Sequence, residues 1–467
     1  MDEDTPDHPP SAQKSIEDHV TKYVHVLDEF EYLTGFTEQN ESTLHGLEAF
    51  FTSYERLRGT TVLATEKKAI RRETITALKQ AAAILEDGGM DELRSHSLGS
   101  APGDFFHRLC NDGVRSHLAG EATVHMFTIP FKRPRYARLY SSLLIAIVGA
   151  CEVFLGSLMK EFLGARPQIL KNTEVRLLFS DLASFDDLDS FKSHQIDRQV
   201  EAVIRQGGID EWMKWFEDKL RIQKASVTRD FEAIREMFQR RHIHVHNDGR
   251  VSDLYLQKLP DLGKTAPRKG SYLAVDAEYL LSSINHLRVM GIVLSTLVSQ
   301  KLSRGDATPQ LDDSVATMVY DLLSAGRHEL VDDLVKLLLP HFQSEAPRLR
   351  TQINGWIARS RLGDSEVEKE ATAWDTSALS PVFKLAQLVL TGQLDDAQKE
   401  AITQIERGSL DQEEYDEWPL FLPLRQRFQK ADQLGVTESV TERIEELVDK
   451  TEPEAMDMHK PNTPPDL

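Results

Sequence analysis

Cysteine is scarce in this chain of 467 residues: only Cys110 and Cys151 occur, far apart and without any CxxC pair. This scarcity excludes a disulfide framework and a zinc ribbon, and it fits a reducing compartment. The HExxH and HxHxDH patterns of metal-dependent hydrolases are also missing. The first residues, MDEDTPDHPP, are acidic and contain proline, unlike a signal peptide. We therefore expect a cytoplasmic protein.

Long hydrophobic runs are missing as well. The longest apolar run covers residues 143–158 (LLIAIVGACEVFLGSL) and carries Glu152 near its centre. It is shorter than the ~20 residues that a helix needs to span a bilayer. The run predicts a buried helix, and we expect no membrane partner.

Strand patterns are equally rare, and the spacing of apolar residues predicts helices almost throughout. The central region carries an apolar helix near residues 140–163 and further helices near 209–222, 227–245 and 276–302. Towards the C-terminus, residues 314–325, 329–338, 381–390 and 394–405 form short helices separated by glycine-containing turns, the rhythm of helical repeats. The predicted fold class is mostly α, with an antiparallel helical bundle in the centre.

Charge is uneven along the chain, although the net value is −20. Residues 1–130 sum to −10, residues 131–303 to +5 and residues 304–467 to −15. A chain this acidic is not expected to coat nucleic acid indiscriminately, but its basic centre could attract phosphate locally. Charge and helix patterns together predict five segments: a disordered tail (1–15), a helical N-terminal region (16–130), the central bundle (131–303), an acidic, repeat-like helical domain (304–451) and a second disordered tail (452–467).

The most polar stretch is residues 239–256, QRRHIHVHNDGRVSDLYL. Its alternating histidines, His242, His244 and His246, would face one side of a strand and suit a metal ion. On a helix only His242 and His246 share a face, and no carboxylate partner is evident. We therefore expect neither a bound metal nor another cofactor.

A structural interpretation of the same stretch is a helix end. Basic residues followed by Asn or Gly are common there, because cations suit the C-terminal dipole and Gly or Asn accepts left-handed geometry. Against this, Arg241 falls on the predicted apolar stripe that runs through Phe231, Ile234, Phe238 and Val245. A charge directed at a packed face is costly unless it meets a partner or lines a cleft.

A third interpretation rests on a resemblance. Arg241 and His246, followed by Asn247, resemble the RxxxxH motif of HEPN domains (higher eukaryotes and prokaryotes nucleotide-binding). The wider pattern resembles RNxxVHNxGxVxxxYL of bacterial members, and the matching residues are Arg241, Val245, His246, Asn247, Gly249, Val251, Tyr255 and Leu256. The chain departs where His242 replaces the usual Asn. The resemblance covers roughly residues 135–302.

This resemblance implies a metal-independent endoribonuclease whose active site forms in a homodimer. Arg241 and His246 would be catalytic, with His242, Asn247 and Glu152 as supporting polar residues. Arg240 would bind the RNA backbone, the alternative being a solvated surface arginine. Residues five apart on a helix point about 140° from each other, so one copy is poorly arranged to grip one phosphate from two sides.

Two functions remain open at this point. The first is a ribonuclease of toxin or antiphage-defence type, with the acidic helical regions docking a regulatory protein partner. The second is a non-catalytic HEPN scaffold or RNA-binding module that acts through protein partners of the C-terminal helical region. The intact Arg241/His246 pair favours the first.

Overall fold

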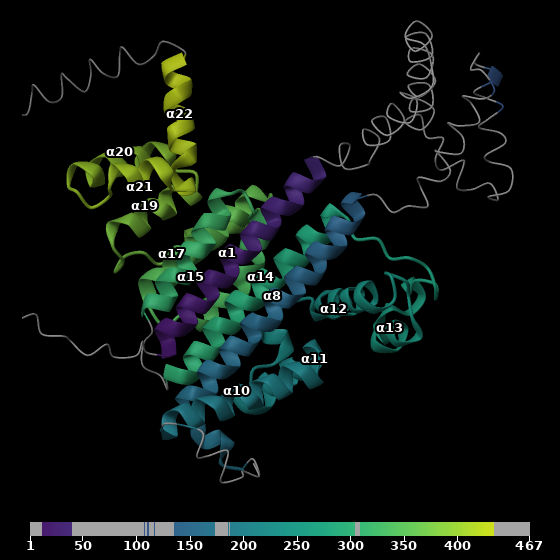
Figure 1. Cartoon of the computed structure of the whole chain (residues 1–467). Helices are drawn as coiled ribbons and strands as arrows, with labels where there is room; N and C mark the ends of the chain where they lie inside the picture. Colours follow the sequence, from purple (N-terminus) through teal and green to yellow (C-terminus); the bar gives the residue numbers. More distant parts are fainter. Residues whose placement is uncertain are drawn as a thin grey trace, which may run out of the picture. The chain divides into compact units, whose positions relative to one another are not determined.

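A computed structural model describes residues 12–39, 135–172, 187–303 and 309–433, together with residues 107, 110, 111, 116 and 185. Within these residues the chain is helical and forms no strand, so the mostly-α prediction is confirmed for the described part (Figure 1). The chain divides into two compact units, Met1–Thr308 and Pro309–Leu467. Most of the predicted helical N-terminal region (16–130) and the whole predicted C-terminal tail (452–467) lie outside the described residues.

The first unit contains seven described α-helices: α1 (Ala12–Gln39), α8 (Arg135–Ala165), α10 (Leu188–Gln206), α11 (Ile209–Leu220), α12 (Phe231–His246), α13 (Asp253–Lys258) and α14 (Ala277–Ser303). Short 3-10 turns, η2 (Pro167–Asn172), η3 (Lys224–Ser226) and η4 (Pro260–Thr265), lie between them. The three long helices α1, α8 and α14 pack along one another, and α10 and α12 pack against α8. Helix α14 contacts α12 as well, so both α8 and α14 connect the long bundle to α12.

Helix α1 approaches α8 and α14 closely. The ring of Tyr23 stacks on Phe154 of α8 with 4.1 Å between centroids. A Cβ at Gly291 of α14 would come within 2.5 Å of Tyr23 Cε1, so a glycine is required at this crossing. Helix α1 starts at Ala12, inside the predicted tail 1–15, and packs with helices of the predicted central bundle rather than apart from them.

A buried ion cluster also joins α1 to α14. Arg288 has only 2% of its surface exposed, and its guanidinium contacts the carboxylates of Asp28 and Glu31, the latter at 2.7 Å. A buried guanidinium needs such partners, because an unpaired charge in the interior is strongly unfavourable. The cluster therefore couples the position of α1 to that of α14.

Two described helices, Tyr136–Ala165 within α8 and α14 itself, are long and apolar enough to cross a membrane by length and composition. In this fold 78% of the apolar window of α14 is buried, but only 50% of that of α8. The prediction of a buried helix around Glu152 is therefore confirmed for one side of α8 and wrong for the other. One side of α8 packs in the bundle, whereas Val153 on the other side is 72% exposed.

Helix α12 begins at an Asp230 cap, whose carboxylate accepts from the backbone N–H of Ala233 at 2.9 Å. Its buried residues are Ile234, Met237, Phe238 and Ile243. The predicted apolar stripe was wrong at its end: Val245 is 44% exposed and Ile243 takes the buried position. The reason is that Ile243 packs on Val251 and Tyr255, which follow α12 in the chain.

The second unit is a succession of short antiparallel helices: α15 (Pro309–Ser324), α16 (His328–Leu338), α17 (Glu345–Arg361), α18 (Glu366–Ala373), α19 (Pro381–Leu390), α20 (Leu394–Glu406), α21 (Gln412–Glu417) and α22 (Leu422–Gln433), with 3-10 turns η5 (Leu339–His341) and η6 (Pro419–Phe421). The four helices predicted here match α15, α16, α19 and α20. Gly326, Gly363 and Gly392 adopt positive φ angles at the turns of three successive hairpins.

Candidate functional site

The predicted motif lies at the C-terminal end of α12 and in the turn that follows. The backbone N–H of Asn247 donates to Ile243 O at 2.8 Å and ends the helix. Its side-chain Nδ2 donates to Arg250 O at 2.6 Å. Asp248 and Gly249 then adopt φ angles of 51° and 70°, so the chain reverses through two left-handed residues. Asn247 therefore stabilises the turn.

Gly249 is required by a close approach as well as by its positive φ. A Cβ there would come within 2.4 Å of Tyr272 Cε2 and 2.8 Å of His244 Cε1. Leu273 N donates to Gly249 O at 2.9 Å and fastens this turn to the later segment. The ring of His244 hydrogen-bonds Leu273 O at 2.9 Å and packs edge-on against Tyr272. His244 is therefore a packing residue.

Several other residues that match the family pattern also build this corner. Val251, Tyr255 and Ile243 belong to one buried cluster, and Leu256 packs on it. Their role in the structure is to hold the end of α12 in place. The motif residues whose side chains remain available for chemistry are therefore Arg241, His242 and His246.

Arg241 points to α8. Its Nη2 lies 3.6 Å from Glu152 Oε1, and the two side chains are 28% and 27% exposed. This distance is longer than a hydrogen bond. The Nε atom of Arg241 is buried and has no hydrogen-bond partner among the residues that the structure describes. The structure thus brings Glu152, predicted as a supporting polar residue, next to the predicted catalytic arginine.

The rings of His242 and His246 contact each other one turn apart at the end of α12, with centroids 4.7 Å apart and planes tilted by 48°. Partial burial, and then the neighbouring His246 and Arg241, lower the pKa of His242 below its ordinary value. The imidazole of His242 is therefore mainly neutral at neutral pH. His246 is exposed to solvent.

Arg240 is held by contacts within the protein. Its Nε donates to Glu236 Oε1 at 2.8 Å, its Nη1 donates to Ala274 O at 3.0 Å, and its guanidinium lies 3.9 Å from the ring centroid of Tyr279. The side chain is therefore not a solvated surface arginine. Binding of an RNA backbone by Arg240 stays a prediction.

Glu236 is the residue that sequence reasoning missed. It accepts hydrogen bonds from the hydroxyl groups of Tyr255 at 2.6 Å and Tyr279 at 2.7 Å, in addition to Arg240. Burial, followed by the Glu236 charge, raises the pKa of both tyrosines above their ordinary value. The only sequence signal was the spacing of Glu236 and Arg240 by four residues on one helix.

The three alternating histidines do not converge on one point, because His244 turns to Leu273 whereas the rings of His242 and His246 contact each other. In the parts of the chain that the structure describes, no group of three or more His, Cys, Asp or Glu side chains is arranged to hold a metal ion. The assembled site consists of Arg241, Glu152, His242 and His246. No protein-family model, curated protein or solved structure matches the chain.

Proposed function

We propose that this protein is a metal-independent endoribonuclease of the HEPN kind, with Arg241 and His246 as its catalytic residues. The observation that carries the proposal is that the Arg241 guanidinium is partly buried while its hydrogen-bond donors remain unused among the described residues. The guanidinium also lies close to the His242 imidazole. Such a fork matches two oxygens of a phosphate group.

The chemistry needs no external nucleophile, because RNA carries the ribose 2′-OH. The 2′-oxygen attacks phosphorus and loses its proton, and the bond from phosphorus to the 5′-oxygen breaks. The His246 imidazole can act as the base or the acid in this step. Arg241 stabilises the charge on the non-bridging oxygens. The products are a 2′,3′-cyclic phosphate and a 5′-hydroxyl.

The three supporting residues, His242, Asn247 and Glu152, each contact a different part of the site. His242 is next to both Arg241 and His246, and its lowered pKa keeps a neutral ring that can donate or accept a hydrogen bond. Asn247 already donates a hydrogen bond to Arg250 O, so it supports the site by stabilising the turn that follows α12. Glu152 orients Arg241 from α8.

A homodimer would complete this site. Helix α8 leaves Leu139, Ser142, Ala146 and Val153 exposed at helical spacing, and Gly149 between them has no atom within 4 Å of an added Cβ. We call these five residues the α8 stripe. It lies directly beside Glu152, the partner of Arg241. A second copy on this stripe would bring a second RxxxxH segment close to the first and cover apolar surface that is now exposed.

The biological role that goes with this chemistry is that of a toxin or an antiphage-defence nuclease. A second candidate is a non-catalytic scaffold or RNA-binding module. The observation that favours it is the Glu152 carboxylate, which offsets the charge of Arg241 within the same chain. The two functions differ in RNA cleavage: only the nuclease cuts RNA, and it needs both Arg241 and His246 to do so.

The test is cleavage of single-stranded RNA by purified full-length protein in EDTA, comparing wild type with Arg241→Ala and His246→Ala. We expect either substitution to lower the rate by about 10²–10⁴-fold. Arg250→Ala, in the neighbouring exposed turn, is the matched control and should cut normally. Cutting that EDTA abolishes would refute the metal-independent mechanism. Absence of cleavage in vitro and in phage-challenged cells would favour the scaffold.

A further inference from the structure

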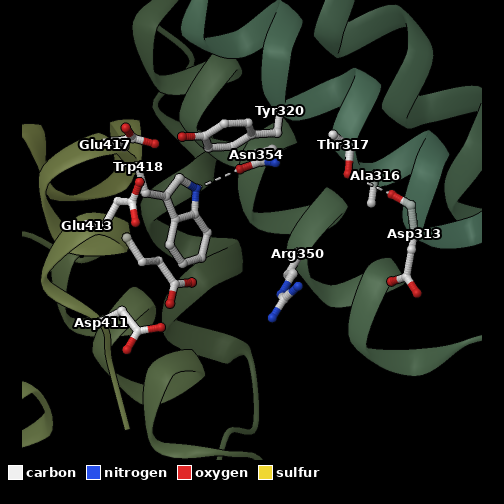
Figure 2. A pocket seen from close by; sticks show the side chains of 11 residues that line it. Asp313, Ala316, Thr317, Tyr320, Arg350, Asn354, Asp411, Glu413, Glu417 and Trp418 are labelled. Atoms are coloured by element: carbon white, nitrogen blue, oxygen red, sulfur yellow. Dashed lines mark hydrogen bonds between the residues drawn. The ribbon is translucent and has the colours of Figure 1, made fainter. Parts of the chain in front are cut away.

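The second unit contains a cavity of about 660 Å³ with walls from α15, α17 and the segment around α21 (Figure 2). Five carboxylates line it: Asp313, Asp411, Glu413, Glu414 and Glu417. The buried amide of Asn354 in its wall already accepts a hydrogen bond from Trp418 Nε1 at 2.9 Å. A cluster of acidic side chains around an open hollow does not by itself indicate a ligand. The more informative groups lie in the first unit, at the end of α12.

His242 and His246 end α12 with ring nitrogens that have no use within the described part of the chain. Their rings contact each other, with centroids 4.7 Å apart and planes tilted by 48°. Neither ring forms a hydrogen bond or an ion pair with another described residue. By contrast, the ring of His244 is hydrogen-bonded to Leu273 O at 2.9 Å. Two neighbouring imidazoles are therefore available to exchange protons with a substrate.

The surroundings of the two rings differ. His242 is half-buried, whereas His246 is exposed. Burial, followed by the charges of His246 and Arg241, lowers the pKa of His242. The carboxylate that α8 brings to this end of α12, Glu152, lies 3.6 Å from Arg241 and is not among the groups that shift His242. His242 is therefore ready to accept a proton, and water can solvate a protonated His246 ring.

We infer that His242 is a further catalytic residue, the general base that takes the proton of the ribose 2′-OH, and that His246 is the general acid. This inference rests on the proposed ribonuclease function. Two oxygens bonded to one phosphorus lie only a few ångströms apart, so the base and the acid that serve them must be close neighbours. The contacting rings of His242 and His246 meet this requirement, next to the guanidinium of Arg241.

Each proton in the step has a donor and an acceptor. The 2′-oxygen gives its proton to His242 and forms a bond with phosphorus. The bond from phosphorus to the 5′-oxygen breaks, its electron pair stays on that oxygen, and His246 protonates it. His242 is then charged and His246 is neutral. Because the two rings contact each other, the proton can return from His242 to His246 directly or through water, and the pair is reset.

The test compares His242→Asn with His246→Asn in full-length protein on two RNA substrates. One substrate has the ordinary 5′-oxygen at the cleavage site, and in the other a sulfur replaces this oxygen. A thiolate leaves without being protonated, so the sulfur substrate needs a base but no acid. On ordinary RNA we expect either variant to lose about 10²–10⁴-fold in rate. On the sulfur substrate, His246→Asn should cut at nearly the wild-type rate and His242→Asn should stay slow. The matched control is His25→Asn, at an exposed position of α1, which should cut both substrates like wild type.

The Asn variant also separates catalysis from hydrogen bonding, because Asn is the usual residue at this position in the pattern that the motif resembles. If His242→Asn cuts ordinary RNA at the wild-type rate, residue 242 only forms a hydrogen bond and the inference is overturned. If the sulfur substrate restores His242→Asn, the residue is the acid, which overturns the assignment as well. A wild type that cuts neither substrate refutes the proposed nuclease function and the base with it.

A second variant covers a failure to fold. If circular dichroism shows that His242→Asn has lost its helices, His242→Ala with added imidazole becomes the deciding measurement. Free imidazole replaces a missing base but not a missing packing residue. Recovery of RNA cleavage with increasing imidazole supports the inference, and no recovery overturns it.

Discussion

Arg241 of α12 and Glu152 of α8 face each other with 3.6 Å between Nη2 and Oε1, from positions far apart in the sequence. Their attraction is electrostatic, since the distance exceeds that of a hydrogen bond. The guanidinium is thereby oriented without losing its donors. This is the arrangement that a phosphate-binding arginine needs before its substrate arrives.

The first prediction concerns the strength of this pair. Both side chains are more than a quarter exposed, so we expect a coupling free energy of about 0.2–1 kcal/mol. Urea unfolding of Glu152→Gln, Arg241→Met and the double variant measures it as a double-mutant cycle. Coupling above ~2 kcal/mol would show a firmly held structural pair and would favour the scaffold function.

The second prediction concerns the α8 stripe. Val153→Glu places a charge in the centre of the proposed dimer face, so the protein should become monomeric and lose RNA cleavage. Leu188→Glu, at an exposed apolar position on α10, is the matched control and should keep both properties. Light scattering after gel filtration gives the oligomeric state. A wild-type monomer that cuts RNA would contradict the composite site.

The third prediction concerns Arg288. Arg288→Ala removes both ion pairs to α1 and leaves a cavity, so the free energy of unfolding should fall by about 2–4 kcal/mol. Arg205→Ala, which breaks an exposed pair with Glu201, should cost less than ~0.5 kcal/mol. Urea denaturation measures both. Equal losses would mean that the buried cluster does not hold α1.

The fourth prediction compares two helical glycines. Gly291→Ala forces a Cβ against the Tyr23 ring and should lower the free energy of unfolding by about 1–3 kcal/mol. Gly35→Ala lies in open space within α1 and should raise it by about 0.5–1 kcal/mol. Thermal unfolding should shift in opposite directions. A stabilised Gly291→Ala variant would show that α1 does not pack this closely.

The fifth prediction concerns pH. The pKa of His242 is lower in the folded protein than in the unfolded chain, first through burial and then through His246 and Arg241. The unfolded chain therefore binds this proton more readily. The contribution of neutral His242 to stability is complete above the ordinary value of about 6.5 and declines as the pH falls below it. Unfolding free energies of wild type and His242→Gln, measured from about pH 8 to about pH 5, should show the steeper decline for wild type. Parallel curves would contradict the assignment.

Local signals predicted local structure well. Helices α15, α16, α19 and α20 follow from apolar spacing and glycine turns, because both are fixed within a few residues of chain. The Asn-Asp-Gly turn after α12 follows from residues that accept left-handed geometry. The same reasoning failed at Val245, since which face of the helix end is covered depends on how the chain that follows α12 packs back on it.

The sequence by itself determined the mostly helical class and the positions of the motif residues along α12. The tertiary structure decided what each side chain meets: Glu152 for Arg241, the Ala274 carbonyl and Tyr279 ring for Arg240, and α1 for the buried Arg288. It also gathered the carboxylates and Asn354 around one cavity from three separate segments. Helix formation depends on neighbours within a turn or two, whereas ion pairs, buried donors and cavities depend on contacts between residues far apart in the chain.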